Sequence, residues 1–172
     1  MKNLKLFALF VLLISSLSVS QSFAQVERVE MRVDGLACPF CSYGLEKKLK
    51  EVKGADKVTI YVDKGLTVLT SKKMQSLNVE QLEPVVLDAG FTPGPISLTA
   101  TGSVSEKNGA PVFLVSGTDI MFMLKNNAQL EKLRAGSNRA PVKVTGSLTK
   151  ETPQGHGGHP YTLTIDKVEV TK

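Results

Sequence analysis

The sequence contains no tryptophan, and aromatic residues make up only 6% of its 172 residues. Surfaces that bind single-stranded nucleic acid stack bases on aromatic side chains, so this composition argues against such a surface. The charges argue the same way, because the net charge is only +5 and the lysines and arginines are interspersed with acidic residues. We therefore expect no nucleic-acid partner.

Motifs that carry catalysis are also missing. The sequence shows no Ser/His/Asp arrangement, no motif that places paired carboxylates, and no glycine-rich phosphate loop. The sequence therefore predicts that the protein is not an enzyme.

Long hydrophobic runs are absent apart from one near the N-terminus. Residues 6–14 are all apolar, follow Lys2 and Lys5, and lead through a serine-rich stretch to Ala24. This order is typical of a secretory signal peptide cleaved after Ala24, and the run is too short for a membrane span of about 20 residues. Removing residues 1–24 takes away two lysines and no acidic residue. We expect a soluble periplasmic or secreted protein with a net charge of +3.

Residues 25–97 predict a ferredoxin-like domain. Val29, Met31 and Val33 alternate with charged residues, which is typical of a half-buried strand. The expected strands are 26–34, 58–62, 66–70 and 95–98, and the expected helices are 41–52 and 79–89, the second of them capped by Asn78 and bent by Pro84. The order β-α-β-β-α-β is the split βαβ arrangement of ferredoxin-like domains.

Residues 98–172 predict a small, mostly-β domain. The expected strands are 98–105, 112–116, 120–124, 142–150 and 161–170, with one short helix at 128–133. Five strands with a helix between the third and fourth match an OB-like barrel. The fold class expected for the whole chain is therefore α+β, and the second domain is expected to dock to a partner.

The two cysteines of the chain lie together in Cys38-Pro39-Phe40-Cys41, between the first predicted strand and the first predicted helix. The helix dipole and free backbone N–H groups at that position favour a thiolate. Two thiolates this close can hold one ion, and soft sulfur ligands favour Cu(I) over Mg or Ca. Zinc normally takes four ligands, so copper is the first candidate. A disulfide across so short a loop would remove little entropy from the unfolded chain.

The stretch Gly35-Leu36-Ala37-Cys38-Pro39-Phe40-Cys41 and the ending Asp88-Ala89-Gly90-Phe91 carry a resemblance. Residues 26 to about 98 resemble a heavy-metal-associated domain, the fold of copper chaperones, of metal-transporting ATPase modules and of the periplasmic mercury-binding protein. That family reads Gly-Met-Thr-Cys-x-x-Cys, so Leu36 and Ala37 depart from it. The resemblance implies that Cys38 and Cys41 bind the metal and that Leu36 and Phe91 cover the site. It implies Cu(I), with Hg(II) or Zn(II) as alternatives, and delivery to a membrane transporter or efflux partner.

Two other interpretations of the cysteine pair stay open. A CxxC pair at a helix N-terminus also occurs in thiol-disulfide redox proteins, although the tryptophan that usually precedes it is absent here. The pair could also form an inert disulfide in a structural or interaction module.

Other sulfur and imidazole groups have simpler explanations. His156 and His159 offer a secondary metal site, but two histidines alone make an incomplete one, so we favour a polar connection. Met121 and Met123 share a face of a predicted strand, and we expect them to fill gaps in the core.

Overall fold

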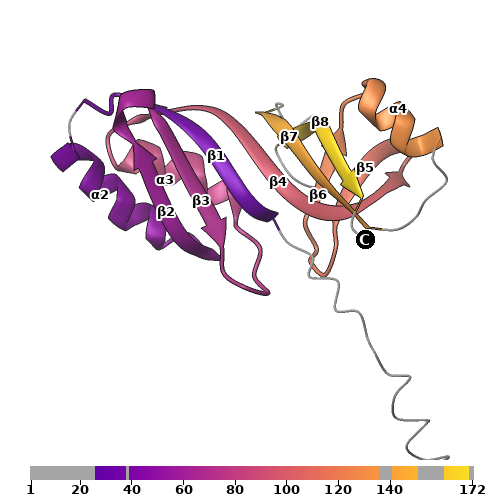
Figure 1. Ribbon diagram of the computed structural model, residues 1–172, viewed down its shortest axis with the longest axis horizontal. Coiled ribbons are helices and arrows are strands. Elements are labelled where there is room, and N and C mark those ends of the chain that lie inside the picture. The colour runs from indigo at the N-terminus through magenta and orange to yellow at the C-terminus, as the bar shows by residue number, and fades with distance from the viewer. Residues whose placement is uncertain (1–25, 38, 136–140, 151–160, 171–172) are drawn as a thin grey trace, which may run out of the picture.

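The computed structural model describes residues 26–37, 39–135, 141–150 and 161–170 (Figure 1). Its first elements are β1 (Val26–Asp34), α2 (Pro39–Lys50), β2 (Ala55–Tyr61), β3 (Leu66–Ser71), α3 (Leu82–Asp88) and β4 (Thr92–Lys107). Short 3-10 turns at Val62–Lys64 and Val79–Gln81 precede β3 and α3. The predicted order β-α-β-β-α-β is confirmed. No helix in these ranges is both long enough and apolar enough to cross a membrane.

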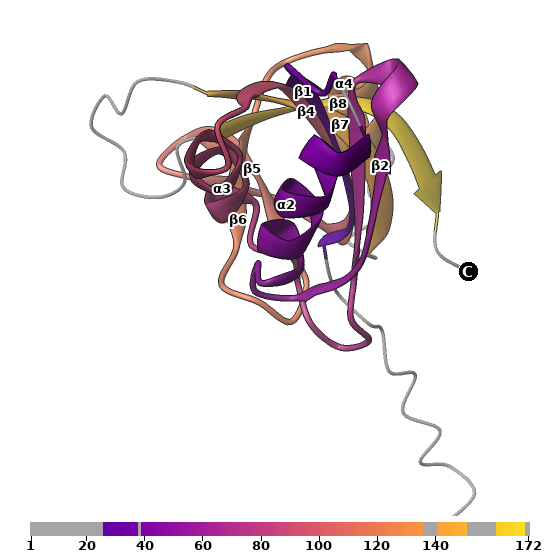
Figure 2. The same cartoon turned by 90° about the vertical axis from the view of Figure 1, so that its left-hand side faces the viewer.

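The four strands of this first half pair in the order β2-β3-β1-β4. β1 lies inside the sheet, antiparallel to β3 through Val29↔Leu69 and to β4 through Val29↔Leu98. As its alternation predicted, Val29 and Met31 are completely buried. Helices α2 and α3 pack together over one face of the sheet (Figure 2). Only four residues connect β1 to α2, so the first turn of α2 is tied to the end of β1.

The helices bury the positions that the sequence predicted. Leu45 and Leu49 in α2 are fully buried. Asn78 acts as the predicted cap, because its Oδ1 accepts a hydrogen bond of 3.1 Å from the Glu80 N–H. The prediction that Pro84 bends the helix is wrong. Helix α3 begins at Leu82, so Pro84 lies in its first turn, where a backbone N–H has no intrahelical partner.

β4 is one strand of 16 residues that belongs to both halves of the chain. We expected two strands here, at 95–98 and 98–105, and the structure joins them. Along one edge β4 pairs with β1 as far as Val26↔Ala100 and then with β5 from Gly102↔Val115. The boundary expected between residues 97 and 98 falls inside this strand, and the division into two domains stays a prediction.

The second half contains β5 (Ala110–Val115), β6 (Met121–Leu124), α4 (Ala128–Ala135), β7 (Val142–Lys150) and β8 (Tyr161–Val170), close to the predicted positions. Strands β4, β5, β6, β8 and β7 pair in that order, and β7 also pairs with β4, so the pairings form a closed ring. The β6–β8 pair is parallel. The chain is therefore α+β with one large mixed sheet, while the OB-like assignment stays a prediction.

Two glycines inside strands permit the close approach of neighbours in the ring. A Cβ added to Gly102 would lie 2.2 Å from Leu114 O, and a Cβ added to Gly146 would lie 2.3 Å from Thr164 O. Neither distance is a tolerable contact, so any side chain at these two positions would push adjacent strands apart.

Polar contacts and a common core join the two halves. Glu27 in β1 accepts a hydrogen bond of 2.6 Å from Lys143 Nζ in β7. Glu83 in α3 accepts one of 2.5 Å from Lys150 Nζ in β7. Burial, together with the negative charge and hydrogen bond of Glu83, raises the pKa of Tyr161 in β8. One cluster of buried side chains extends through both halves.

Candidate metal centre around Cys41

Cys41 lies in the first turn of α2, as predicted from its place after the first strand, and the structure leaves it exposed to solvent. β1 ends at Asp34, and Gly35 turns the chain with a φ of +93°, in the region that favours glycine. Helix α2 begins at Pro39, whose fixed φ and missing N–H suit the first helical position. Cys38, the other predicted ligand, lies outside the described residues.

The start of α2 is electrostatically suited to a thiolate. The first backbone N–H groups of a helix have no intrahelical partners, and the positive end of the helix dipole stabilises negative charge there. The first turn holds no acidic residue, while Lys47, Lys48 and Lys50 all lie in the last turn. A reduced Cys41 is therefore placed where ionisation is favoured, and a thiolate is a good ligand for soft cations.

Cys41 is disulfide-bonded in the structure, and Cys38 is the only other cysteine of the chain. A disulfide sulfur offers no thiolate, so binding of a soft cation by Cys41 requires reduction first. The redox state of this position therefore controls whether it can act as a ligand.

The two predicted cover residues come together at the end of the sheet where α2 begins. Asp34 pairs with Thr92, so the end of β1 meets the beginning of β4. Leu36 follows this pair and Phe91 precedes it, and both side chains are partly buried against the core. A Cβ added to Gly35 would lie 3.6 Å from Phe91 Cδ1, which places the Phe91 ring beside the turn that leads to the cysteines.

A charged contact far from Cys41 joins α2 to α3 at the surface. Lys48 forms a salt bridge with Asp88 at the end of α3. The hydrogen bond and positive charge of Lys48 lower the pKa of the Asp88 carboxyl, so Asp88 stays ionised at neutral pH. An exposed pair of this kind contributes little to stability, and it places no charge at the first turn of α2.

Two exposed aromatic residues beside Cys41 were not predicted as part of the site. The side chain of Phe40 is 93% exposed and that of Tyr43 is 70% exposed. From the sequence, Phe40 stood out only as a residue between the cysteines. Helical spacing could have revealed both residues, because they lie off the row in which Leu45 and Leu49 are buried.

The remaining predicted donors do not join this site. His156 and His159 lie outside the described residues. Met121 and Met123 share a face of β6 but are partly exposed, while Phe122 between them is buried. The prediction that the two methionines fill the core is therefore wrong, since the strand alternation points the intervening residues inward. Within the described ranges, no three His, Cys, Asp or Glu side chains group together as metal ligands.

Three solved structures resemble part of the chain. A copper-binding domain of the P-type ATPase HMA7 is 22% identical with a TM-score of 0.35, over 39% of this chain and 89% of that one. The N-terminal domain of PacS from Synechocystis PCC6803 is 16% identical with a TM-score of 0.34, over 39% of this chain and 92% of that one. The yeast copper transporter domain Ccc2A, solved in apo and Cu(I)-loaded states, is 20% identical with a TM-score of 0.36, over 40% of this chain and 92% of that one. No family model and no curated protein matches the chain. We draw no functional conclusion from likeness at this level.

Proposed function

We propose that this chain is an exported protein that binds one soft metal ion, Cu(I) first, between Cys38 and Cys41. The observation that carries the proposal is the position of Cys41 in the first turn of α2, which is tied to the end of β1. There the helix dipole favours a thiolate, and Leu36 and Phe91 lie at the same end of the sheet as the start of the helix. Hg(II) and Zn(II) are the competing ions.

The ion would be cargo that passes to a membrane transporter or efflux protein by stepwise thiolate exchange. The exposed Phe40 and Tyr43 support this part of the proposal, because aromatic side chains are enriched where proteins contact one another. The second half, which we propose to be an OB-like barrel, would orient or dock the transfer. The ring of strand pairs and the parallel β6–β8 contact support that assignment.

One observation favours a second candidate function. The disulfide at Cys41, exposed at a helix N-terminus, is also the arrangement of a thiol-disulfide redox protein. Such a protein would exchange disulfides with a substrate thiol instead of holding an ion.

Competitive binding of Cu(I), Zn(II) and Hg(II) to the reduced protein tests both candidates. The protein is purified after export, and mass spectrometry of its N-terminus checks cleavage after Ala24. We expect one thiophilic ion per chain, lost in Cys38→Ser/Cys41→Ser and kept in the control His156→Ala/His159→Ala. If the reduced wild type binds no ion but reduces a model disulfide, the redox function replaces the metal function.

A further inference from the structure

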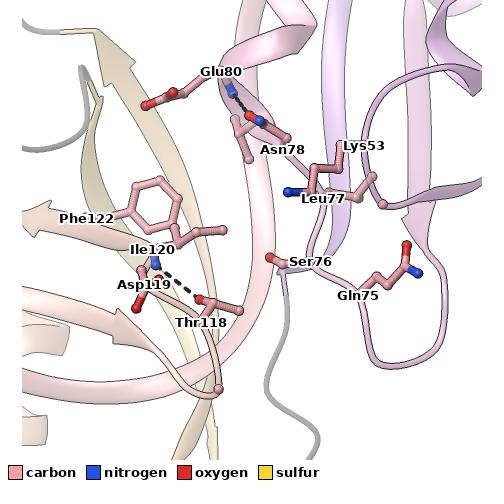
Figure 3. A pocket seen from close by; sticks show the side chains of 13 residues that line it. Lys53, Gln75, Ser76, Leu77, Asn78, Glu80, Thr118, Asp119, Ile120 and Phe122 are labelled. Atoms are coloured by element: carbon pink, nitrogen blue, oxygen red, sulfur yellow. Dashed lines mark hydrogen bonds between the residues drawn. The ribbon is translucent and has the colours of Figure 1, made fainter.

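A cleft of about 610 Å³ lies between the two halves, at the end of α2 opposite to Cys41. The link after α2 and the loop after β3 form one wall, and the turn between β5 and β6 forms the other. In Figure 3, Lys53 and Leu77 lie on the first wall, and Asp119 and Ile120 lie on the second. The volume lies in the range of small-molecule sites, which often occur between domains. The metal proposal gives this cleft no role.

The first wall is built by contacts within the protein. Ser76 Oγ accepts a hydrogen bond of 3.0 Å from the Val26 N–H, and the Asn78 N–H donates one of 3.0 Å to Lys53 O. A Cβ added to Gly54 would lie 2.2 Å from Ser76 O, so this approach requires glycine. The loop after β3 is thus fixed against the link that follows α2.

The second wall is equally well determined. Thr118 Oγ1 donates a hydrogen bond of 3.0 Å to Val115 O and accepts one of 3.2 Å from the Ile120 N–H (Figure 3). These contacts hold the β5–β6 turn in one conformation. Binding in a cleft with such walls would cost little ordering of the protein.

Each wall contributes one exposed charge of opposite sign, the ammonium of Lys53 and the carboxylate of Asp119. Among the residues that the structure describes, neither of these two groups forms an ion pair. Burial and Glu83 raise the pKa of Tyr161 in β8, and Glu80, which also lines the cleft, adds to this effect. We assign no ligand group to Glu80.

Opposite charges on opposite walls favour a ligand that carries both signs. A cation would attract Asp119 but bring its charge towards Lys53, and an anion would do the reverse. An uncharged ligand would take water from both groups without replacing their hydrogen bonds. The surface between the two charges is mainly apolar, and Leu77 is buried beneath it. The cleft therefore suits two opposite charges joined by an apolar body.

We propose that this cleft binds a small zwitterion with an apolar body, such as a short apolar peptide with free termini. The ammonium of the ligand lies beside Asp119 and its carboxylate beside Lys53, while the apolar body contacts Ile120 and the wall around it. This site is separate from the cysteines and needs neither a metal nor their reduction.

Four forms of one dipeptide test the two charges separately. The protein is titrated with leucyl-phenylalanine, its N-acetyl form, its C-terminal amide and the form blocked at both ends. Binding is followed by NMR through the methyl groups of Ile120, Leu77 and Val79. We expect the free dipeptide to bind most tightly and each block to weaken binding about two- to fivefold, the range that one solvated ion pair supplies. Added salt should weaken binding of the free dipeptide and leave that of the doubly blocked form unchanged.

Substitutions assign each charge of the ligand to one wall. In Asp119→Asn, acetylation of the dipeptide should no longer weaken binding while amidation still does, and Lys53→Gln should show the reverse. Ile120→Ala should weaken binding of all four forms. The exposed residues Asp63 in the β2–β3 turn and Lys57 in β2 provide the matched controls Asp63→Asn and Lys57→Gln, which should change nothing.

Several outcomes would contradict the zwitterion. Equal binding of the four forms would mean that the cleft does not recognise charge. A loss on acetylation alone would indicate a cation site, and a loss on amidation alone an anion site, so either result would overturn the proposal. The same holds if Asp119→Asn and Lys53→Gln respond alike. The four titrations of the wild type keep the test decisive if a variant is unstable.

Discussion

The two halves of the molecule share β4 but complete their sheets in different ways. In the first half, two amphipathic helices cover one face of four strands. In the second half, five strands pair in a closed ring, with a single short helix between β6 and β7. The first half therefore depends on rows of leucines and valines in its helices, and the second depends on glycines where strands approach each other.

The two halves also present different structural elements at their candidate binding sites. The covered sheet leaves one open end, where β1 passes into α2 and Cys41 is exposed. The ring instead presents the β5–β6 turn, which forms one wall of the cleft. A helix-covered sheet thus offers a helix N-terminus that favours a thiolate, whereas the ring offers a turn held by hydrogen bonds.

The largest predicted effect comes from a glycine in the ring of strands. Gly102→Ala places a Cβ against Leu114 O and the Phe113 ring, and we expect the free energy of unfolding to fall by about 2–3 kcal/mol in chemical denaturation. Gly44→Ala is the matched control in the first half. No atom lies within 4 Å of a Cβ added there, in a helix, so this variant should gain up to about 1 kcal/mol. Similar losses in both variants would refute the contrast between the halves.

Reduction should act mainly at the start of α2. A disulfide between Cys38 and Cys41 closes so short a loop that its removal should lower the free energy of unfolding by no more than about 2 kcal/mol. Hydrogen exchange should quicken most at the start of α2, while exchange in β7 and β8 should quicken only as far as the global free energy of unfolding falls. A larger change in those strands would show that the redox state acts directly on the second half.

A smaller effect is expected where a carboxylate joins the halves. Glu27 accepts hydrogen bonds from Lys143 Nζ and, at 2.7 Å, from Thr101 Oγ1. We expect Glu27→Gln to cost about 1 kcal/mol of unfolding free energy. Among the described residues, Glu30 on the same strand forms an ion pair only with the exposed Arg28, so Glu30→Gln should cost less than about 0.5 kcal/mol. Equal losses in the two variants would mean that the contact of Glu27 with Lys143 and Thr101 adds nothing to the free energy of unfolding.

The last predicted effect is a loss of stability that appears only at alkaline pH and depends on Tyr161. The pKa of Tyr161 is raised in the folded protein, so the unfolded chain loses its phenol proton first as the pH rises above about 10. Stability that is complete below that pH should therefore decline above it. Tyr161→Phe should flatten this decline in urea titrations, while Tyr43→Phe, at a largely exposed position, should not. A decline of the same slope in Tyr161→Phe would rule out this residue as the cause.

Local patterns predicted most of the fold. The alternation of Val29, Met31 and Val33 and the Asn78 cap each depend on neighbours in sequence, and the structure has them as predicted. The continuous β4 could not be predicted, because it results from pairing with β1, β5 and β7 together. Likewise, the sequence around Pro84 does not say where the preceding 3-10 turn gives way to α3.

Of the candidate site, the sequence predicted the cysteine motif and the residues near it, but not the other features. The order of strand, loop and helix placed Cys41, and it placed Leu36 and Phe91 at one end of the sheet. The partial exposure of Met121 and Met123 depends on which face of β6 meets the core, and alternation alone does not decide between the two faces. The cleft between the halves was also missed, because its walls combine three segments, at residues 53–54, 75–80 and 117–122, that are distant in sequence and carry no common motif.

The long β4 strand has a consequence for how the protein can be divided and how it unfolds. Leu98, Thr99 and Ala100 are partners of β1, although they lie beyond residue 97, and the same residues are partners of β7 on the opposite edge. A fragment cut after residue 97 would leave Val26, Arg28 and Val29 of β1 without their partners in β4, exposing a strand edge that invites aggregation. Loss of either half should therefore propagate along this strand, and we expect the protein to melt as one cooperative unit instead of in two steps.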